Sequence, residues 1–343
     1  MKKRNMLITA GLLLAGGLFY GGISVYYEFY PAPKEPSATW ESYVNSLNAQ
    51  REAFFVDADG VKLESELFIP NGGASKKPAI VFAPGSGDAL YQNYSPDFIE
   101  TYILDFFISH DFAVLLVNKR GMGLSEGLYT DLSIEGRAED VLTSVKAIQA
   151  HPRIDASKIG LVGHSEGGWT VTYAAAQNPD IAFFINLAGP TITRMEQAVD
   201  MYTFEAICSG LEGAELDEYV EKRTKKTKLG MKIGKVINFG LLGFDYRSMS
   251  FDPRNALETI KNPGLFIFAE NDILVIPAKN IERMNKIFDG DVPGNFTMTI
   301  VKDATHSFRL VDVPCDSWNE STQYEMSTEV TTILNDWLNE FGY

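Results

Sequence analysis

Cysteine is scarce in this sequence, and its scarcity excludes two kinds of small domain. Cys208 and Cys315 are the only cysteines among the 343 residues. Two are too few for a scaffold built on disulfides, and the pair lacks the spacing of zinc ligands. They could form one bridge in an oxidising compartment, but their positions in the sequence do not show that they meet. We expect no metal site and no cofactor.

Positive charge is also in short supply. Lysine and arginine number 30 against 45 aspartates and glutamates, which gives a formal net charge of −15. Non-specific binding to nucleic acid needs a positive surface that displaces counterions, so nucleic acid is excluded as a partner. The length allows one large α/β domain with an insertion, and such a chain can bury a full core.

Charged residues are absent from residues 6–27, which follow the basic start Lys2-Lys3-Arg4. About 22 residues in a helix, at ~1.5 Å each, are enough to cross a hydrocarbon core of roughly 30 Å. The basic residues should stay on the cytoplasmic side, so the rest of the chain should lie outside. The pattern therefore predicts a signal anchor at 1–27, with the membrane as a partner and an extracytoplasmic catalytic domain.

A cleaved signal peptide is the alternative interpretation of the same segment, and it would leave a secreted or periplasmic protein. No Ala-x-Ala cleavage site and no lipobox cysteine follow the apolar run, which favours the uncleaved anchor. Pro31, Pro33 and Pro36 then predict a stiff spacer, within a linker at residues 28–50.

Strand-like and helix-like patterns alternate along the rest of the chain. Short apolar or β-rich runs predict strands at 53–56, 61–69, 79–83, 112–117, 158–162, 181–187, 264–268 and 297–301. Apolar residues at helical spacing predict helices at 97–109, 134–150, 169–177, 278–287 and 327–341. This alternation predicts an α/β fold, with a mostly parallel sheet and helices on both of its faces.

One long segment breaks the alternation. Residues 191–255 have helical character without strand character, and connections in such sheets usually span only a few residues. We therefore expect an inserted helical subdomain at 191–255, between core segments at 51–190 and 256–343. Its basic run, which we expect to be a solvated face, consists of Lys222, Arg223, Lys225, Lys226, Lys228, Lys232 and Lys235. Its apolar group includes Phe239, Leu241, Leu242, Phe244 and Tyr246.

A serine lies at a tight junction between a predicted strand and a predicted helix. Gly163-His164-Ser165-Glu166-Gly167 connects the strand at 158–162 to the helix that follows. Gly-x-Ser-x-Gly in this context is the nucleophile elbow, where side chains at the glycine positions would collide with neighbouring elements. The alternative interpretation is a glycine-rich turn without chemistry.

A nucleophilic serine needs a base, and the base needs an acid that orients it. Only four histidines are present. His164 must point away from the neighbouring serine, while His110 and His151 lie at helix ends on the opposite side of the sheet from the strand carboxyl ends. His306 remains, directly after the last core strand. The strand before it is followed by two acids: we expect Asp272 to serve, with Glu270 as the second choice. Carboxyl ends of parallel strands meet at one edge, so these residues should converge.

From about residue 53 onward the chain resembles an α/β-hydrolase of the serine esterase and lipase type. The resemblance rests on the elbow, on Arg120-Gly-Met-Gly-Leu-Ser125, on Glu270-Asn-Asp272 and on Asp303-Ala-Thr-His306. The order Ser, Asp, His along the chain is that of this family. By the resemblance, the insertion at 191–255 is a cap over the site.

The oxyanion hole should consist of backbone N–H groups. The elbow supplies one from Glu166, and the turn Pro84-Gly85-Ser86-Gly87 supplies the other, from Ser86 first and Gly87 second. We expect the Glu166 side chain itself to be an exposed acid at the start of a helix.

These features predict a serine hydrolase that cleaves a small-molecule carboxylic ester with a hydrophobic acyl part, through Ser165, His306 and Asp272. Phe239, Phe244 and Tyr246 of the cap are the expected substrate-binding residues. A peptidase or an acyl thioesterase on the same triad is the first alternative. Peptidases of the prolyl-oligopeptidase kind usually carry an aromatic residue after the serine, where this chain has Glu166. A non-catalytic binding module is the alternative from another class.

Overall fold

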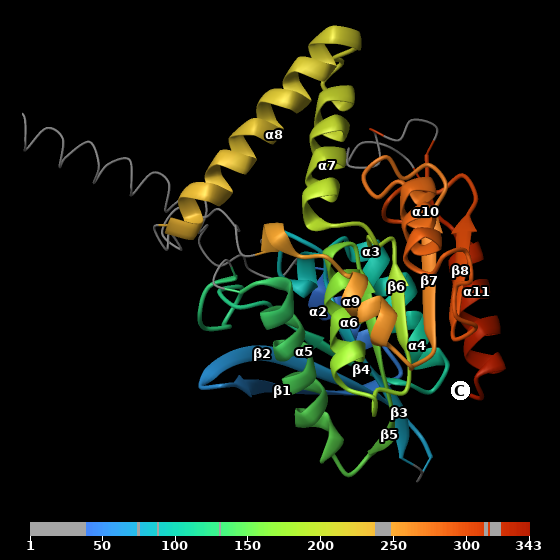
Figure 1. Ribbon diagram of the computed structural model, residues 1–343. Coiled ribbons are helices and arrows are strands. Elements are labelled where there is room, and N and C mark those ends of the chain that lie inside the picture. The colour runs from blue at the N-terminus through green and yellow to red at the C-terminus, as the bar shows by residue number, and fades with distance from the viewer. Residues whose placement is uncertain are drawn as a thin grey trace, which may run out of the picture.

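Eight strands form one sheet at the centre of the molecule (Figure 1). The computed structural model describes residues 39–73, 76–87, 89–129, 132–236, 248–311, 315 and 324–343. The strands are β1 (Ala49–Ala58), β2 (Val61–Pro70), β3 (Lys77–Ala83), β4 (Ala113–Val117), β5 (Ile154–His164), β6 (Phe184–Leu187), β7 (Gly264–Ala269) and β8 (Phe296–Val301). Their order is β1-β2-β4-β3-β5-β6-β7-β8. β1, β2 and β4 pair antiparallel, and every pair from β4 to β8 is parallel. The predicted mostly parallel sheet is confirmed.

The burial of each strand follows from its place in this order. Every residue of β7, a central strand, is buried, so its sequence is a continuous apolar run. β1 lies at the edge and alternates between exposed and less exposed residues over much of its length. All eight strands predicted from the sequence overlap observed strands.

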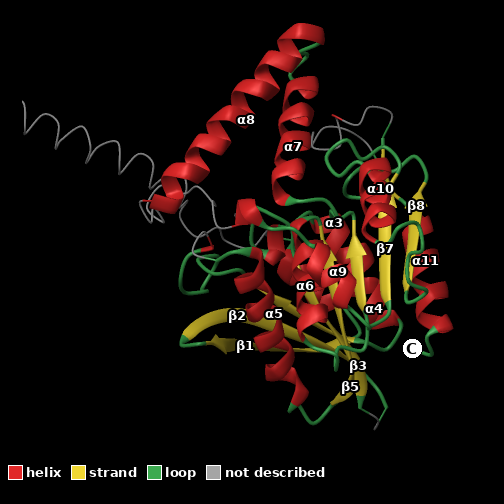
Figure 2. Cartoon of the chain, in the orientation of Figure 1, coloured by secondary structure: helices red, strands yellow, loops and turns green. Residues whose placement is uncertain are grey.

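Helices cover both faces of the sheet (Figure 2). One face packs against α2 (Trp40–Ser46), a helical segment made of α3 (Pro96–Phe98), η2 (Ile99–Asp105) and α4 (Phe106–Ser109), and α11 (Thr328–Glu340). The other packs against α5 (Ile134–Gln149), α6 (Glu166–Gln177), α9 (Arg254–Thr259) and α10 (Pro277–Ile287). The short elements are η1 (Tyr91–Asn93), η5 (Ser248–Ser250), β9 (Arg309–Leu310) and β10 (Glu325–Met326). The predicted two-faced helical cover is confirmed.

A helical hairpin projects beyond these layers. α7 (Arg194–Cys208) and α8 (Gly213–Val236) extend away from the sheet at the end where β6 and β7 finish (Figure 1). α7 begins with a capping box, in which Thr193 accepts from the Glu196 amide and Glu196 accepts from the Thr193 amide. The two helices pack through Tyr202, whose hydroxyl lies 2.6 Å from the Thr227 hydroxyl. The hairpin lies within the insertion predicted from the sequence.

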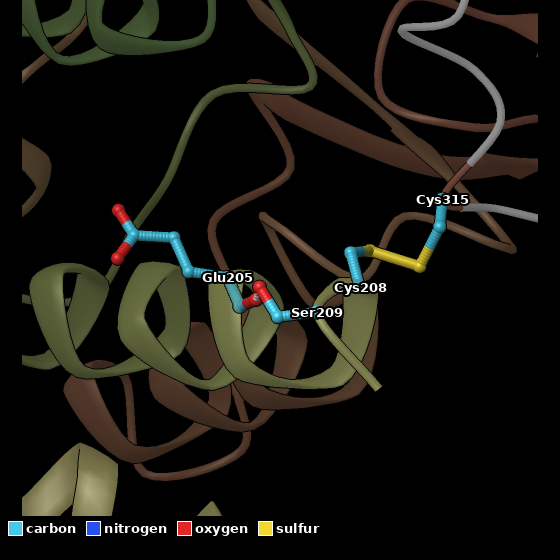
Figure 3. The surroundings of a disulfide bond; sticks show 4 residues. All are labelled: Glu205, Cys208, Ser209 and Cys315. Atoms are coloured by element: carbon cyan, nitrogen blue, oxygen red, sulfur yellow. Dashed lines mark hydrogen bonds between the residues drawn. A yellow bond between two sulfur atoms is a disulfide. The ribbon is translucent and has the colours of Figure 1, made fainter. Parts of the chain in front are cut away.

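A disulfide joins the far end of α7 to the segment that follows β9. Cys208 and Cys315 are bonded, at a sequence separation of 107 (Figure 3). Cys208 lies in the last turn of α7, where the Ser209 hydroxyl donates to the Glu205 carbonyl oxygen at 2.7 Å. The two cysteines therefore meet, which the sequence alone did not establish.

The transmembrane part of the predicted fold class is corrected. In the part of the chain that the structure describes, no helix is both long enough and apolar enough to cross a bilayer. α8 has 24 residues, but it carries the basic run of the insertion, which a hydrocarbon core would not accept. The predicted anchor at residues 6–27 lies outside the described residues. The anchor, the membrane partner and the locations inferred from them are therefore withdrawn.

Candidate active site

Ser165 lies in the turn between β5 and α6. Its φ of 55° and ψ of −123° are sparsely populated for a residue with a side chain, at a cost of about 1–3 kcal/mol. The surrounding backbone holds it there: the Ser165 amide donates to the Leu187 carbonyl at 3.0 Å, and its own carbonyl accepts from the Gly168 amide at 2.8 Å. A Cβ on Gly163 would collide with the Gly167 carbonyl, so the turn needs glycine at that position.

Asp272 and His306 form a buried pair at the carboxyl ends of β7 and β8. His306 Nδ1 lies 2.7 Å from Asp272 Oδ2, and both side chains are at most 5% exposed. The other carboxylate oxygen of Asp272 accepts from the amides of Leu274, at 2.9 Å, and Val275, at 2.8 Å. The carboxylate is thus fixed by three donors, and it holds the imidazole with Nδ1 as the protonated nitrogen.

The alternatives considered from the sequence lie elsewhere. Glu270 is exposed and accepts from the Asp303 amide at 3.1 Å, rather than from a histidine. His110 Nδ1 lies 2.7 Å from the Phe106 carbonyl, and His151 Nε2 lies 3.3 Å from a carboxylate oxygen of Glu52. Of the acid candidates and histidines weighed from the sequence, Asp272 and His306 are the two that the structure brings together.

The predicted oxyanion turn follows β3. Ser86 and Gly87 are exposed, and no described residue accepts a hydrogen bond from either of their amides. The Lys119 ammonium donates to the carbonyls of both Gly85, at 2.9 Å, and Gly87. The Gly85 amide donates to the Tyr94 hydroxyl at 2.9 Å. The turn is therefore held from both sides, and two adjacent amides remain available to a ligand.

The Glu166 side chain is buried, contrary to the expectation of an exposed acid. It is 7% exposed and pairs with Arg137 of α5 at 2.7 Å and with Arg194 of α7 at 3.8 Å. The Tyr129 hydroxyl also donates to it, and the Arg137 guanidinium lies 3.9 Å from the centre of that ring. An acid at the first position of a helix can turn back toward neighbouring elements, and here two arginines draw it inward.

Burial and charge act on this carboxylate in opposite directions. Burial raises the pKa of Glu166, but the charges of Arg137 and then Arg194 outweigh it, so the pKa lies below its usual value. The group is ionised at neutral pH and ties the start of α6 to two other helices. A small cavity of about 60 Å³ lies beside it, lined by polar and apolar residues that include Lys119, Tyr129, Arg137 and Glu166.

His164 lies beside the pair without belonging to it. Its Nε2 is 3.0 Å from the His306 carbonyl oxygen, and its Nδ1 is 2.6 Å from the Tyr94 hydroxyl. Burial, followed by the charge of His306, lowers the pKa of His164 to about 3. It is therefore a neutral group that contacts the backbone of the neighbouring histidine.

Three of the predicted site residues cannot be placed. Phe239, Phe244 and Tyr246, the expected substrate-binding residues, lie outside the described residues. Among the residues that are described, no three His, Cys, Asp or Glu side chains lie close enough together to hold a metal ion.

Sequence reasoning missed several residues around the site. Tyr94, Lys119, Arg137 and Arg194 come from four separate segments and match no motif. Only Lys119 carried a local signal, because it precedes the Arg120-Gly-Met-Gly-Leu-Ser125 loop after a core strand. The remaining three are brought to the site by the packing of helices and turns, which spacing along the chain does not reveal.

Comparisons with known proteins match this chain to hydrolases. A family model described as X-Pro dipeptidyl-peptidase (S15 family) matches residues 59–228, just under half of the chain. The acylamino-acid-releasing enzyme 1 of Oryza sativa subsp. japonica is 34% identical over 128 residues. That match covers 36% of this chain and only 16% of the rice protein, so the chain spans a small part of that curated relative.

Two solved structures share the fold over most of their length. The Pyrococcus furiosus esterase Pf2001 has a TM-score of 0.59 at 16% identity, covering 90% of this chain and 97% of that one. Est1E of Butyrivibrio proteoclasticus, solved with ferulic acid bound, has a TM-score of 0.53 at 16% identity, covering 84% and 98%. The matches are to hydrolases of the esterase and peptidase type. Together with the sheet order and the elbow, they show that the chain has the α/β-hydrolase fold.

Proposed function

We propose that this protein is a serine hydrolase that cleaves carboxylic esters with a hydrophobic acyl part. The observation that carries the proposal is the 2.7 Å contact of His306 Nδ1 with the buried Asp272 carboxylate, at the edge of the sheet where Ser165 occupies a strained elbow. In this arrangement Ser165 is the nucleophile, His306 the base and Asp272 the acid that orients the base.

The reaction follows from these roles. Ser165 Oγ bonds to the ester carbonyl carbon while His306 Nε2 takes the hydroxyl proton, and Asp272 stabilises the resulting imidazolium. The tetrahedral oxyanion is bound by backbone amides, for which we assign Glu166 and either Ser86 or Gly87. The carbon–oxygen bond to the alcohol then breaks, and the alcohol leaves with the proton from His306. Water, deprotonated by the same histidine, attacks the acyl-enzyme and releases the acid and free Ser165.

We assign residues 191–255 as a cap above this site, between core segments at 51–190 and 256–343. The hairpin of α7 and α8 lies in that range and projects from the end of the sheet that carries the site (Figure 1). The aromatic residues Phe239, Phe244 and Tyr246 belong to the same range, and we propose that they contact the acyl chain.

Turnover of p-nitrophenyl acetate, butyrate and octanoate tests the triad. Ser165→Ala and His306→Ala should each lower kcat by at least roughly 10³-fold, and Asp272→Asn by roughly 10³–10⁴-fold, because the members act as a unit. Glu270→Gln is the matched control for the acid and should stay within about 3-fold of wild type, since Glu270 contacts no histidine. Wild-type turnover in Ser165→Ala would exclude the mechanism.

Peptide-bond hydrolysis on the same triad is the second candidate, because the S15 model and the acylamino-acid-releasing relative are both peptidase matches. An amide has a poorer leaving group than an ester, which His306 would have to protonate. Comparing a p-nitrophenyl ester with the p-nitroanilide of the same acyl group separates the two. A higher kcat/KM on the anilide would assign the protein as a peptidase, and no turnover of either would favour a non-catalytic module.

A further inference from the structure

A chain of hydrogen bonds runs from the oxyanion turn to the backbone of His306. The Gly85 amide lies 2.9 Å from the Tyr94 hydroxyl oxygen, and that oxygen lies 2.6 Å from His164 Nδ1. His164 Nε2 in turn lies 3.0 Å from the His306 carbonyl oxygen. Two side chains thus connect segments that are far apart in sequence.

Each proton in this chain can be assigned. The His306 carbonyl can only accept, so His164 Nε2 must carry a hydrogen. His164 is neutral because burial lowers its pKa to about 3, which leaves Nδ1 as an acceptor. Burial also raises the pKa of Tyr94, so its hydroxyl stays protonated and donates to Nδ1. The hydroxyl oxygen still accepts from the Gly85 amide, and every donor and acceptor along the chain is paired.

The two ends of this hydrogen-bonded chain are the oxyanion turn and the main chain of His306, and these parts of the site must be aligned. Gly85 precedes Ser86 and Gly87, the assigned oxyanion donors, and its position is close to the nucleophile: a Cβ built on Gly85 would lie 2.9 Å from Ser165 Cβ. The other end is the main chain of the base itself. His164 also adjoins Ser165, so one pair of side chains contacts the segments of all three reacting groups.

We propose that Tyr94 and His164 are positioning residues that fix the oxyanion turn relative to Ser165 and His306. The inference rests on the proposed function. Neither residue touches the substrate; both act through backbone groups of residues that do. Oxyanion donors act only when they meet the developing charge at hydrogen-bond distance, so a small shift of the turn should lower kcat and leave KM nearly unchanged.

Tyr94→Phe is the direct test, because it removes one oxygen and keeps the ring that packs beside Phe82 and His164. Turnover of p-nitrophenyl butyrate should be expressed per active site, titrated with a p-nitrophenyl phosphonate, so that unfolded molecules are not counted. We expect kcat per site to fall roughly 10- to 100-fold, with KM within about 3-fold of wild type.

Tyr102→Phe is the matched control. Tyr102 is a fully buried ring in the same aromatic cluster. Its hydroxyl donates to the Ser327 carbonyl at 2.9 Å, with the Phe308 carbonyl at 3.4 Å, and does not contact Gly85, His164 or the His306 carbonyl. It should cost similar stability and keep kcat per site within about 2-fold. Equal values of kcat per site in Tyr94→Phe and Tyr102→Phe would overturn the proposal, as would a change confined to KM.

Nitrogen-15 spectra of histidine-labelled wild-type protein give a second readout that does not depend on turnover. Only four histidines contribute ring-nitrogen signals, and the pair that is lost in His164→Gln belongs to His164. His164 should be the neutral tautomer with the hydrogen on Nε2 from pH 5 to 8. A hydrogen on Nδ1, or titration within that range, would overturn the proposal. If wild-type protein had the expected tautomer but no activity, the ester hydrolase would be refuted, and the chain of hydrogen bonds from Gly85 to His306 would still be supported.

Discussion

His164 is an ionisable residue that the fold holds without charge. Its usual pKa of 6.5 is lowered to about 3, mainly by burial and also by the charge of His306. In the unfolded chain the same side chain binds a proton below pH 6.5. Between these two values the unfolded state therefore carries more protons than the folded state, and the folded state loses stability as the pH falls.

We predict that the free energy of unfolding declines from pH 6.5 toward pH 3, with His164 contributing on the order of 2–5 kcal/mol over that window. His164→Gln removes the titrating group and should flatten the decline. Urea unfolding at pH 7, 5.5 and 4.5 measures the slope. His110→Gln changes an exposed histidine at the end of α4 and should follow wild type. Equal slopes in His164→Gln and wild type would refute the assignment.

Sequence order was enough to propose the reacting residues, but not their surroundings. Ser165, Asp272 and His306 each follow a strand of a parallel sheet, and the edge that such strands share brings their carboxyl ends together. The partners of Glu166 arise differently: Arg137 lies on α5 and Arg194 on α7, and only the packing of these helices against α6 brings them to the carboxylate. No spacing along the chain encodes that contact.

Among the elements, α7 has contacts with several parts of the site. Arg194 reaches Glu166 beside the nucleophile, and Gln197 Nε2 donates to the Leu274 carbonyl at 2.6 Å, two residues after Asp272. Near the middle of the helix, Asp200 pairs with Lys279 of α10. The disulfide then connects its last turn to the segment that follows the base (Figure 3). This helix links the predicted cap to the segments that carry the proposed triad.

Removing the disulfide should loosen that link. A cross-link between residues 107 apart restricts the unfolded chain, and such bridges typically contribute about 2–4 kcal/mol. We predict that Cys208→Ser/Cys315→Ser lowers the Tm, and that reduced wild-type protein behaves like this double variant. Calorimetry with and without dithiothreitol measures both. The double variant is its own control, since reductant should leave its Tm unchanged; an equal Tm in oxidised wild type and variant would contradict the prediction.

At this scale the sequence predicted the strands well, whereas the predicted anchor lies outside the described residues. β5 and β7 are fully apolar over their inner residues because both faces are covered, so their pattern is unmistakable. The apolar run at residues 6–27 has the length and the flanking charges of a membrane helix but lies outside the described residues, among which no helix could span a bilayer. An uncharged run indicates that a segment could be buried in an apolar environment, but it does not indicate where in the cell or the fold that segment lies.

The molecule as a whole combines a layered core with a projecting hairpin. The sheet is covered on both faces by helices whose buried apolar side chains form two clusters. α8 packs chiefly on α7, and Leu229 on it is 58% exposed. Stability should therefore be distributed unevenly, because local opening is easiest where few apolar contacts would be lost.

We predict that backbone amides of α8 exchange with deuterium much faster than those of β3, β5 and β7, at least about 100-fold at neutral pH. The cause is that, among the described residues, α8 packs chiefly on α7, whereas the strands are buried between two helical layers. Mass-spectrometric exchange of the intact protein resolves these segments, with α6 as an internal helical control. Protection of α8 equal to that of α6 would show that the hairpin opens only with the core.

The bond between Cys208 and Cys315 also has a topological consequence. Asp272 and His306 lie inside the covalent loop that it closes, whereas Ser165 lies outside. A protease that cut the exposed part of α8 once would produce two fragments, each carrying part of the proposed triad. The disulfide would hold the two fragments together, so the cleaved protein would keep Ser165, Asp272 and His306 in one molecule until the disulfide was reduced.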